Sequence, residues 1–113
     1  MKRKMIVTTT NDVVGRKIVE YLGVVRGIVV RSPGLGKNIM GGFAALGGGN
    51  IVQFEEVCEQ ARRDAHVRMV DHARERDADA IIGMRYDANE FSANITEVLA
   101  YGTAVRLDDV GEG

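Results

Sequence analysis

Hydrophobic and polar residues alternate in two segments near the C-terminus. In residues 80–90 the even positions, such as Ile82, Met84 and Tyr86, are apolar and most odd positions are polar, which predicts a strand with one buried face. In residues 95–107 the odd positions carry large side chains and the even positions small ones, such as Ala100 and Gly102. Because both faces of this second strand have apolar character, we expect a helix on one face and another subunit on the other.

A helical period of 3.6 residues follows Asn50 and continues to about Asp77, and it predicts the strongest helix of the chain. Pairs such as Glu59 and Arg63, four positions apart, support its polar side. The apolar stripe of this helix consists of Phe54, Val57, Cys58, Ala61, Ala65, Met69 and His72.

The N-terminal half contains two further predicted strands and a weak helix. Residues 5–8 predict a short strand, and the β-branched residues 17–31 predict either a long bent strand or a hairpin. Gly23 and Gly27 interrupt the second segment, and glycine within a strand marks a bulge, a bend or a close backbone approach. Apolar residues at helical spacing in residues 35–49 predict a short helix, which two internal glycines weaken.

These elements predict one α+β domain over residues 1–113. We expect an antiparallel sheet with one long bent strand and with the weak and the long helix on one face. The strand edges that such a small sheet leaves exposed suit completion by oligomerisation.

Composition excludes several classes of protein. Fifteen basic and sixteen acidic residues give a net charge of −1, which argues against a sequence-independent grip on nucleic acid. No apolar run approaches the ~18 residues of a membrane span, and no apolar segment follows the basic residues 1–4 as in a signal peptide. A single cysteine suits a reducing compartment. We therefore expect a cytoplasmic protein.

Five blocks of the sequence resemble the YbjQ-like family. They are residues 6–10, the glycine-spaced residues 15–27, residues 54–57, residues 78–87 and residues 100–105. The resemblance covers nearly the whole chain, although Phe54 stands where typical members have tyrosine and residues 1–4 lengthen the N-terminus. It implies a small prokaryotic protein that forms a homopentamer with a dodecin-like subunit. The family carries a heavy-metal-binding label, which implies a divalent heavy-metal ion, but no ligand motif can be carried over.

Soft metal ions prefer thiolate and imidazole ligands, which here means Cys58, His66 and His72. On one helix, Cys58 lies roughly 12 Å from His66 and roughly 21 Å from His72 along the axis, so these side chains cannot converge within one subunit. A metal site would need ligands from several subunits. The alternative is that Cys58 is a small buried hydrophobic residue and that His72 is a hydrogen-bonded histidine of the core or an interface.

Other polar positions have ordinary interpretations. Residues 34–38 fit neither the phosphate-binding loop nor the dinucleotide pattern. The run of threonines before Asp12 predicts a strand end and turn rather than a polar pocket, and Asp87 and Glu90 predict solvated carboxylates rather than an acid–base pair. Glu97, on the large-residue face of the last strand, needs a partner such as Tyr101 or an arginine of a neighbouring subunit.

No pair of residues has the spacing of a catalytic nucleophile and base, so we expect a protein that is not an enzyme. The resemblance implies that it is a homo-oligomeric binding protein for metal ions. The alternative is a small-molecule binding or storage assembly with ligand sites between subunits.

Overall fold

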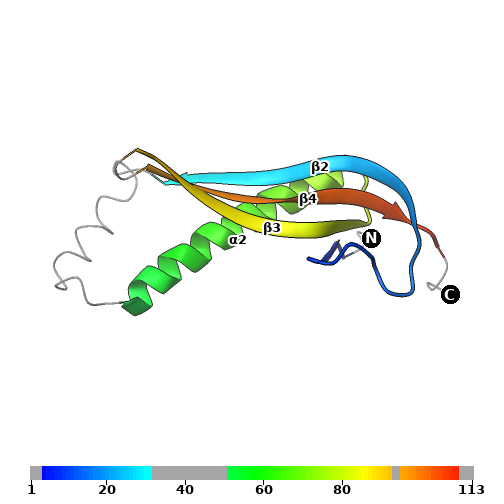
Figure 1. Ribbon diagram of the computed structural model, residues 1–113, viewed down its shortest axis with the longest axis horizontal. Coiled ribbons are helices and arrows are strands. Elements are labelled where there is room, and N and C mark those ends of the chain that lie inside the picture. Colours follow the sequence, from blue (N-terminus) through cyan, green and yellow to red (C-terminus); the bar gives the residue numbers. More distant parts are fainter. Residues whose placement is uncertain (1–3, 32–50, 93–94, 110–113) are drawn as a thin grey trace.

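A computed structural model describes residues 4–31, 51–92 and 95–109 (Figure 1). The elements, in chain order, are β1 (Ile6–Val7), β2 (Ile18–Arg31), α2 (Ile51–Glu75), β3 (Ala80–Ser92) and β4 (Ile95–Leu107). The predicted long strand is therefore one strand and not a hairpin. The weak helix predicted for residues 35–49 lies outside the described residues.

The four strands form one sheet in the order β1-β3-β4-β2. β4 pairs antiparallel with both β3 and β2, whereas β1 runs parallel to β3 through Ile6 opposite Ala80 and Val7 opposite Ile81. The predicted α+β class is confirmed, but the sheet is mixed rather than wholly antiparallel. Parallel pairing is possible here because a long connection that includes α2 separates β1 from β3.

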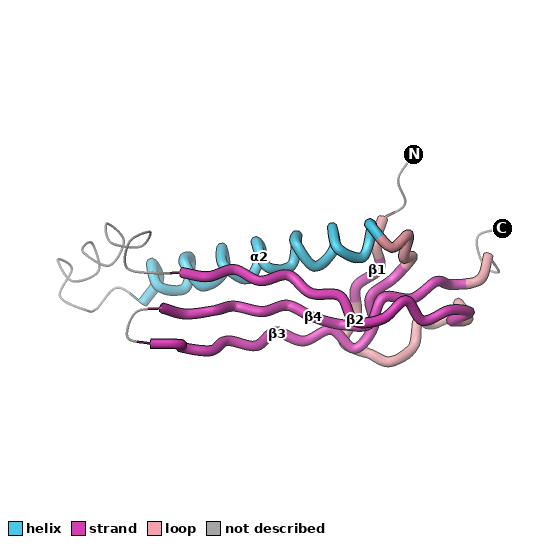
Figure 2. Tube along the Cα trace, turned by 90° about the horizontal axis from the view of Figure 1, so that it is seen from above, coloured by secondary structure: helices cyan, strands magenta, loops and turns pink. Residues whose placement is uncertain are grey.

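Helix α2 covers one face of the sheet, which we call the inner face, and runs along β2 (Figure 2). The inner face is built from small residues on β4, so the helix packs closely. The buried residues of this core are Val25, Val29, Ala65, Met69, Ala73, Ile81, Met84, Ala100 and Ala104. The helix predicted for one face of β4 thus covers its small-residue side.

The two glycines of β2 have different roles. Gly23 has φ +97° and lies where the register between β2 and β4 shifts, so it forms a bulge. Gly27 faces α2, and a Cβ atom there would overlap the carbonyl oxygen of Ala65 and the backbone nitrogen of Met69. Gly27 therefore allows the backbones of β2 and α2 to touch.

A bulge in β3 divides its apolar positions between the two faces of the sheet. Gly83 has φ +61°, and the register with β4 shifts between Ile82 and Arg85. Ile82 consequently lies opposite Thr103, while Tyr86 lies opposite Ala100 on the inner face. The prediction that the even positions of β3 share one buried face was wrong. An alternating pattern does not show where a bulge inserts an extra residue, and the residues after the bulge change faces.

The sheet face opposite α2, which we call the outer face, has a covered end and an exposed end. Near the start of β3 the N-terminal segment covers it and forms a second core of Ala80, Ile82, Val105 and Leu107 with Ile6, Val13 and Ile18. Beyond this core Val24, Ile28, Val30 and Tyr101 are exposed, Val24 to 61%. Val24, Ile28 and Val30 lie on the outer side of β2, and Tyr101 on β4 is the register partner of Arg26, which stands between Val24 and Ile28.

Helix α2 ends at Glu75, two residues before the predicted end. Asp77, with φ 57°, forms the turn into β3, and its backbone N–H donates to the carbonyl oxygen of Arg74. No helix in the described part of the chain is long and apolar enough to cross a membrane.

Replacing Gly27 with alanine tests the contact between β2 and α2. We expect Gly27→Ala to lower the free energy of unfolding by about 3 kcal/mol, since the added methyl group meets backbone atoms and α2 must move away. Gly102→Ala is the comparison: its Cβ would meet the side-chain Cγ2 of buried Ile81 at 2.5 Å and no backbone atom closer than the carbonyl oxygen of Ile82 at 3.0 Å, so we expect a smaller loss there. Urea unfolding measures both, and equal losses would contradict the proposed backbone contact.

Candidate functional site

Three polar side chains at and after the end of α2 bind the free edge of β2. Arg68 and His72 lie on successive turns of the same side of the helix, and Arg76 follows four positions later, directly after the last helical residue, Glu75. We call these residues the edge-capping row. The two arginines donate to carbonyl oxygens of β2: Arg68 Nη1 to Ile28, and Arg76 Nη1 to Leu22 at 3.0 Å and Val24 at 3.2 Å.

His72 is the acceptor in this row. The backbone N–H of Arg26 donates to its Nδ1 at 3.1 Å. An Nδ1 that accepts carries no hydrogen, so the neutral imidazole carries its hydrogen on Nε2. The hydrogen bond that the alternative interpretation of His72 predicts is therefore present, on a side chain that is half-buried rather than part of the buried core.

Cys58 lies in a groove between α2 and the far ends of β3 and β4. It is exposed, so the expectation that it is a small buried hydrophobic residue was wrong. The groove has a volume of about 420 Å³ and is lined mainly by apolar side chains, including Val57, Ala61 and Val98. Cys58 and Ala61 belong to the apolar stripe of α2, and both line this groove. Ala61 is nevertheless buried, whereas Cys58 is exposed.

An arginine and a tyrosine form a polar wall of this groove. The guanidinium of Arg62 lies 5.8 Å from the centre of the Tyr86 ring, within the range of a cation–π interaction. Thr96 completes the lining on β4.

His66 belongs to another part of the surface. It lines a shallow depression of about 250 Å³ between α2 and the N-terminal segment, together with Lys4, Asp71 and Arg74. The charged residues of this lining are therefore two cations and one carboxylate. This depression shares no lining residue with the groove that contains Cys58.

The three predicted metal ligands thus lie in three separate places: the groove, the shallow depression and the edge-capping row. Within the described residues, no three His, Cys, Asp or Glu side chains are grouped closely enough to hold a metal ion. A metal-bound histidine normally donates its other N–H to an acceptor, whereas Nδ1 of His72 faces the donor of Arg26. The described donors of a single chain therefore do not fit a heavy-metal ion.

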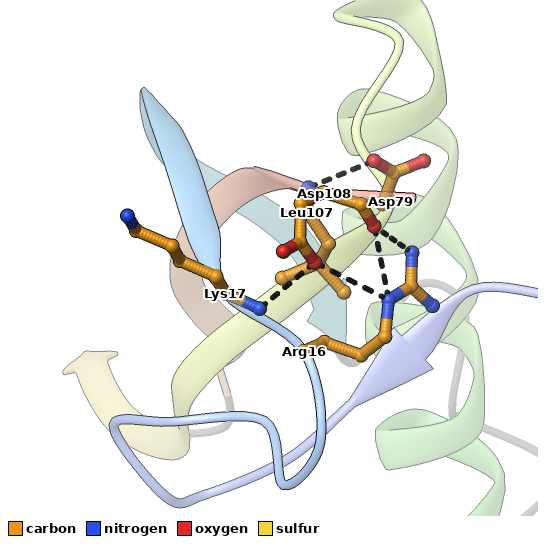
Figure 3. Close-up of polar contacts among 5 residues, drawn as sticks. All are labelled: Arg16, Lys17, Asp79, Leu107 and Asp108. Carbon is orange, nitrogen blue, oxygen red and sulfur yellow. Dashed lines mark hydrogen bonds and ion pairs between the residues drawn. The ribbon is translucent and has the colours of Figure 1, made fainter. Parts of the chain in front are cut away.

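A polar network fixes the end of β4 to the loop before β2 (Figure 3). Arg16 donates through Nε and Nη2 to the carbonyl oxygen of Asp108, at 3.1 and 2.6 Å, and the Lys17 N–H donates to the Asp108 carboxylate at 3.0 Å. The Asp79 carboxylate accepts from the N–H of Leu107 at 2.9 Å. These hydrogen bonds join the loop before β2 and the turn before β3 to the end of β4, so they hold three parts of the fold together.

The remaining polar candidates also have structural roles. The Thr8 and Thr10 hydroxyls bond each other at 2.8 Å and Thr10 donates to the carbonyl oxygen of Asp12, which forms the predicted turn. Asp87 is exposed within β3 and accepts from the N–H of Ala88. Glu97 accepts a long hydrogen bond of 3.4 Å from Asn89.

Sequence reasoning missed the edge-capping row and the Arg16–Asp108 network. A signal for the row is present, because Arg68, His72 and Arg76 repeat at four-residue spacing beside the apolar stripe. The network joins residues 92 positions apart, and no local pattern indicates such a pair.

Residues 5–108 match the sequence model of a family described as "Putative heavy-metal-binding". The chain belongs to this YbjQ-like family. A UPF0145 protein of Saccharolobus islandicus is 48% identical over 103 residues, which cover 91% of this chain and 90% of the relative. A UPF0145 protein of Legionella pneumophila is 50% identical over 101 residues, covering 89% and 96%. The resemblance proposed from the sequence is therefore confirmed.

The fold is similar to that of a solved structure, a protein of unknown function of the DUF74 family from Pediococcus pentosaceus. The TM-score is 0.58 at 20% identity, with 92% of this chain and 98% of the other covered. At this identity the likeness supports the fold alone.

Substitution of His72 tests the edge-capping row. We expect His72→Ala to lower the free energy of unfolding by about 1 kcal/mol, because the Arg26 N–H loses its acceptor. His72→Asn is the control, since its side-chain oxygen can accept from the same N–H. Urea unfolding of the two variants should separate them. If both variants lose the same amount, the hydrogen bond to Nδ1 does not contribute.

Proposed function

We propose that this protein is a non-enzymatic binding protein that assembles with copies of itself. The observation that carries the proposal is the exposed part of the outer face, where Val24, Ile28, Val30 and Tyr101 lie together. An apolar surface of this kind on a small domain favours contact with another protein surface. In a homo-oligomer that surface belongs to another copy.

The two edges of the sheet are less suited to association. The edge-capping row binds backbone groups of β2. On β3, the N-terminal segment pairs with residues 80 and 81 and accepts from the N–H groups of Gly83 and Met84, while Asp87 accepts from the N–H of Ala88. Occupied or charged edges resist the addition of a further strand. Packing by the outer face is therefore favoured over extension of the sheet.

Five copies is the number that the resemblance implies. A ring of five identical subunits requires a heterologous contact, in which two different surfaces of the subunit meet.

We further propose that any metal ion is bound between copies, through Cys58, His66 or His72. This follows from the separation of these three donors within one chain. His72 is the weakest of them as a ligand, because a metal ion on either ring nitrogen displaces the hydrogen bond from Arg26.

The groove beside Cys58 favours the alternative function. Its volume of about 420 Å³ is within the range of small-molecule sites, and apolar walls with a few polar groups are typical of them. The alternative is a small-molecule binding or storage assembly whose ligand a neighbouring copy would help to enclose.

Self-assembly is tested by the mass in solution. We expect sedimentation equilibrium at micromolar concentration to give a species near five subunits, and Ile28→Glu to shift the mass toward the monomer because it places a charge in the apolar surface. The matched control is Val67→Glu, which adds the same charge at an exposed position of α2. A wild-type monomer would contradict the proposed assembly.

Metal binding is tested by calorimetric titration of zinc into the wild type and into Cys58→Ser, His66→Asn and His72→Asn. We expect less than one ion per chain, since a shared site divides one ion among copies, and we expect His72→Asn to bind as the wild type does. Weaker binding by His72→Asn, with assembly intact, would place His72 in the site. If none of these proteins, including the wild type, binds zinc, the proposed metal binding is contradicted.

A further inference from the structure

The groove beside Cys58 extends the inner face beyond the buried core. Ala88 and Val98 are register partners two residues past Tyr86 and its partner, so their side chains lie on the inner face as that of Tyr86 does. Thr96, two residues before Val98, adds a hydroxyl on the same face. The sheet therefore gives the groove a mainly apolar floor, with a tyrosine ring at one end and a hydroxyl at the other.

Helix α2 supplies the opposite wall of the groove. Val57 and Ala61 are its apolar residues, and Ala61 is buried. Cys58 and Arg62 are four positions apart, so they lie on successive turns of the same side of the helix. The wall therefore carries one thiol and one guanidinium beside its apolar surface.

Arg62 is the only cation among the described residues that line the groove. Its guanidinium lies 5.8 Å from the centre of the Tyr86 ring, and the attraction between cation and ring holds it at the groove. Within the described parts of the chain the guanidinium makes no hydrogen bond or ion pair. Its N–H donors are therefore available to a ligand.

Two carboxylates of β3 lie outside the floor of the groove. Asp87 alternates with the residues that face inward, so its side chain projects from the outer face, where it accepts from the amide of Asn89. Glu90 lies on the inner face as the register partner of Thr96 and is not part of the lining. One cation in the lining and one carboxylate at its margin favour a ligand with a single negative charge over a ligand with two.

We propose that this groove binds a small molecule with an apolar body and one carboxylate. The carboxylate lies against the guanidinium of Arg62, whose planar fork can donate two parallel hydrogen bonds to it. The apolar body lies between Val57 and Ala61 on the helix and Val98 on the sheet. This assignment rests on the alternative function proposed for the groove and names its ligand class, and it is independent of self-assembly and of metal binding.

The two parts of the ligand contribute unequally. Burial of the apolar body supplies most of the affinity, because the lining is mainly apolar. Arg62 is exposed, and water weakens an exposed ion pair, so we expect the carboxylate to raise the affinity only about fivefold over an uncharged molecule of the same length. The role of Arg62 is therefore measured by comparing matched ligands rather than by binding of one ligand alone.

The experiment titrates the full-length protein with octanoate and with octanol, which has the same carbon chain without the charge. Isothermal titration calorimetry gives both affinities. Cys58 is the only cysteine of the chain and lies exposed in the groove, so its reaction with the neutral thiol reagent 4,4′-dithiodipyridine reports whether the groove is occupied. Bound octanoate should slow this reaction in proportion to the fraction of protein that is occupied.

Three variants separate the charge from the apolar contact. We expect Arg62→Gln to lower the affinity for octanoate about fivefold, to that for octanol, and to leave octanol binding unchanged. Arg63→Gln is the matched control, because it removes the same charge at the next helix position, outside the lining, and should bind both molecules as the wild type does. Ala88→Phe fills the floor and should weaken both ligands, with circular dichroism to verify folding.

The possible failures overturn different claims. If octanoate and octanol bind equally to the wild type, or if Arg62→Gln leaves their ratio unchanged, the carboxylate assignment is wrong and the groove remains a small-molecule site. If neither ligand binds, or if octanoate binds without protecting Cys58, the small-molecule function of the groove is wrong as well. Self-assembly is judged separately, by the mass in solution.

Discussion

The contact between the backbones of β2 and α2 at Gly27 is the constraint on which the rest of the structure depends. It brings the helix close enough for Arg68, His72 and Arg76 to reach the edge of β2. It also requires small residues where the helix crosses the sheet, and the buried alanines of α2 and β4 meet that requirement. This one close approach thus determines how the inner face packs and which side chains bind the backbone groups at the edge of β2.

The outer face follows from this arrangement and from the bulge at Gly83. Because the bulge moves Ile82 to the outer face, the N-terminal segment has apolar residues to cover at that end. The Arg16–Asp108 network then holds the loop before β2 against the end of β4 (Figure 3). The rest of the face remains exposed, and this is why we assign self-association to it rather than to the edges.

The sequence predicted the regular elements well because their patterns are local. The period of α2, the alternation in β4 and the glycines of β2 each reflect contacts that repeat along one element. Three features escaped prediction because they depend on distant residues. The register shift at Gly83 depends on β4, the exposure of Cys58 on the width of the groove, and the partners of Arg68 and Arg76 on the path of β2. Placing a candidate site therefore required the tertiary arrangement.

His72 shows why residue chemistry alone is a poor guide to a metal site. Its imidazole suggested a ligand, but a neutral imidazole has one hydrogen, and a nitrogen that binds metal uses its lone pair. Metal on Nε2 would therefore place the hydrogen on Nδ1, which could no longer accept from Arg26. Metal binding at His72 would thus break this hydrogen bond between α2 and the edge of β2. Ligands outside the edge-capping row carry no such conflict, and Cys58, exposed beside an open groove, is the donor that a second copy could reach.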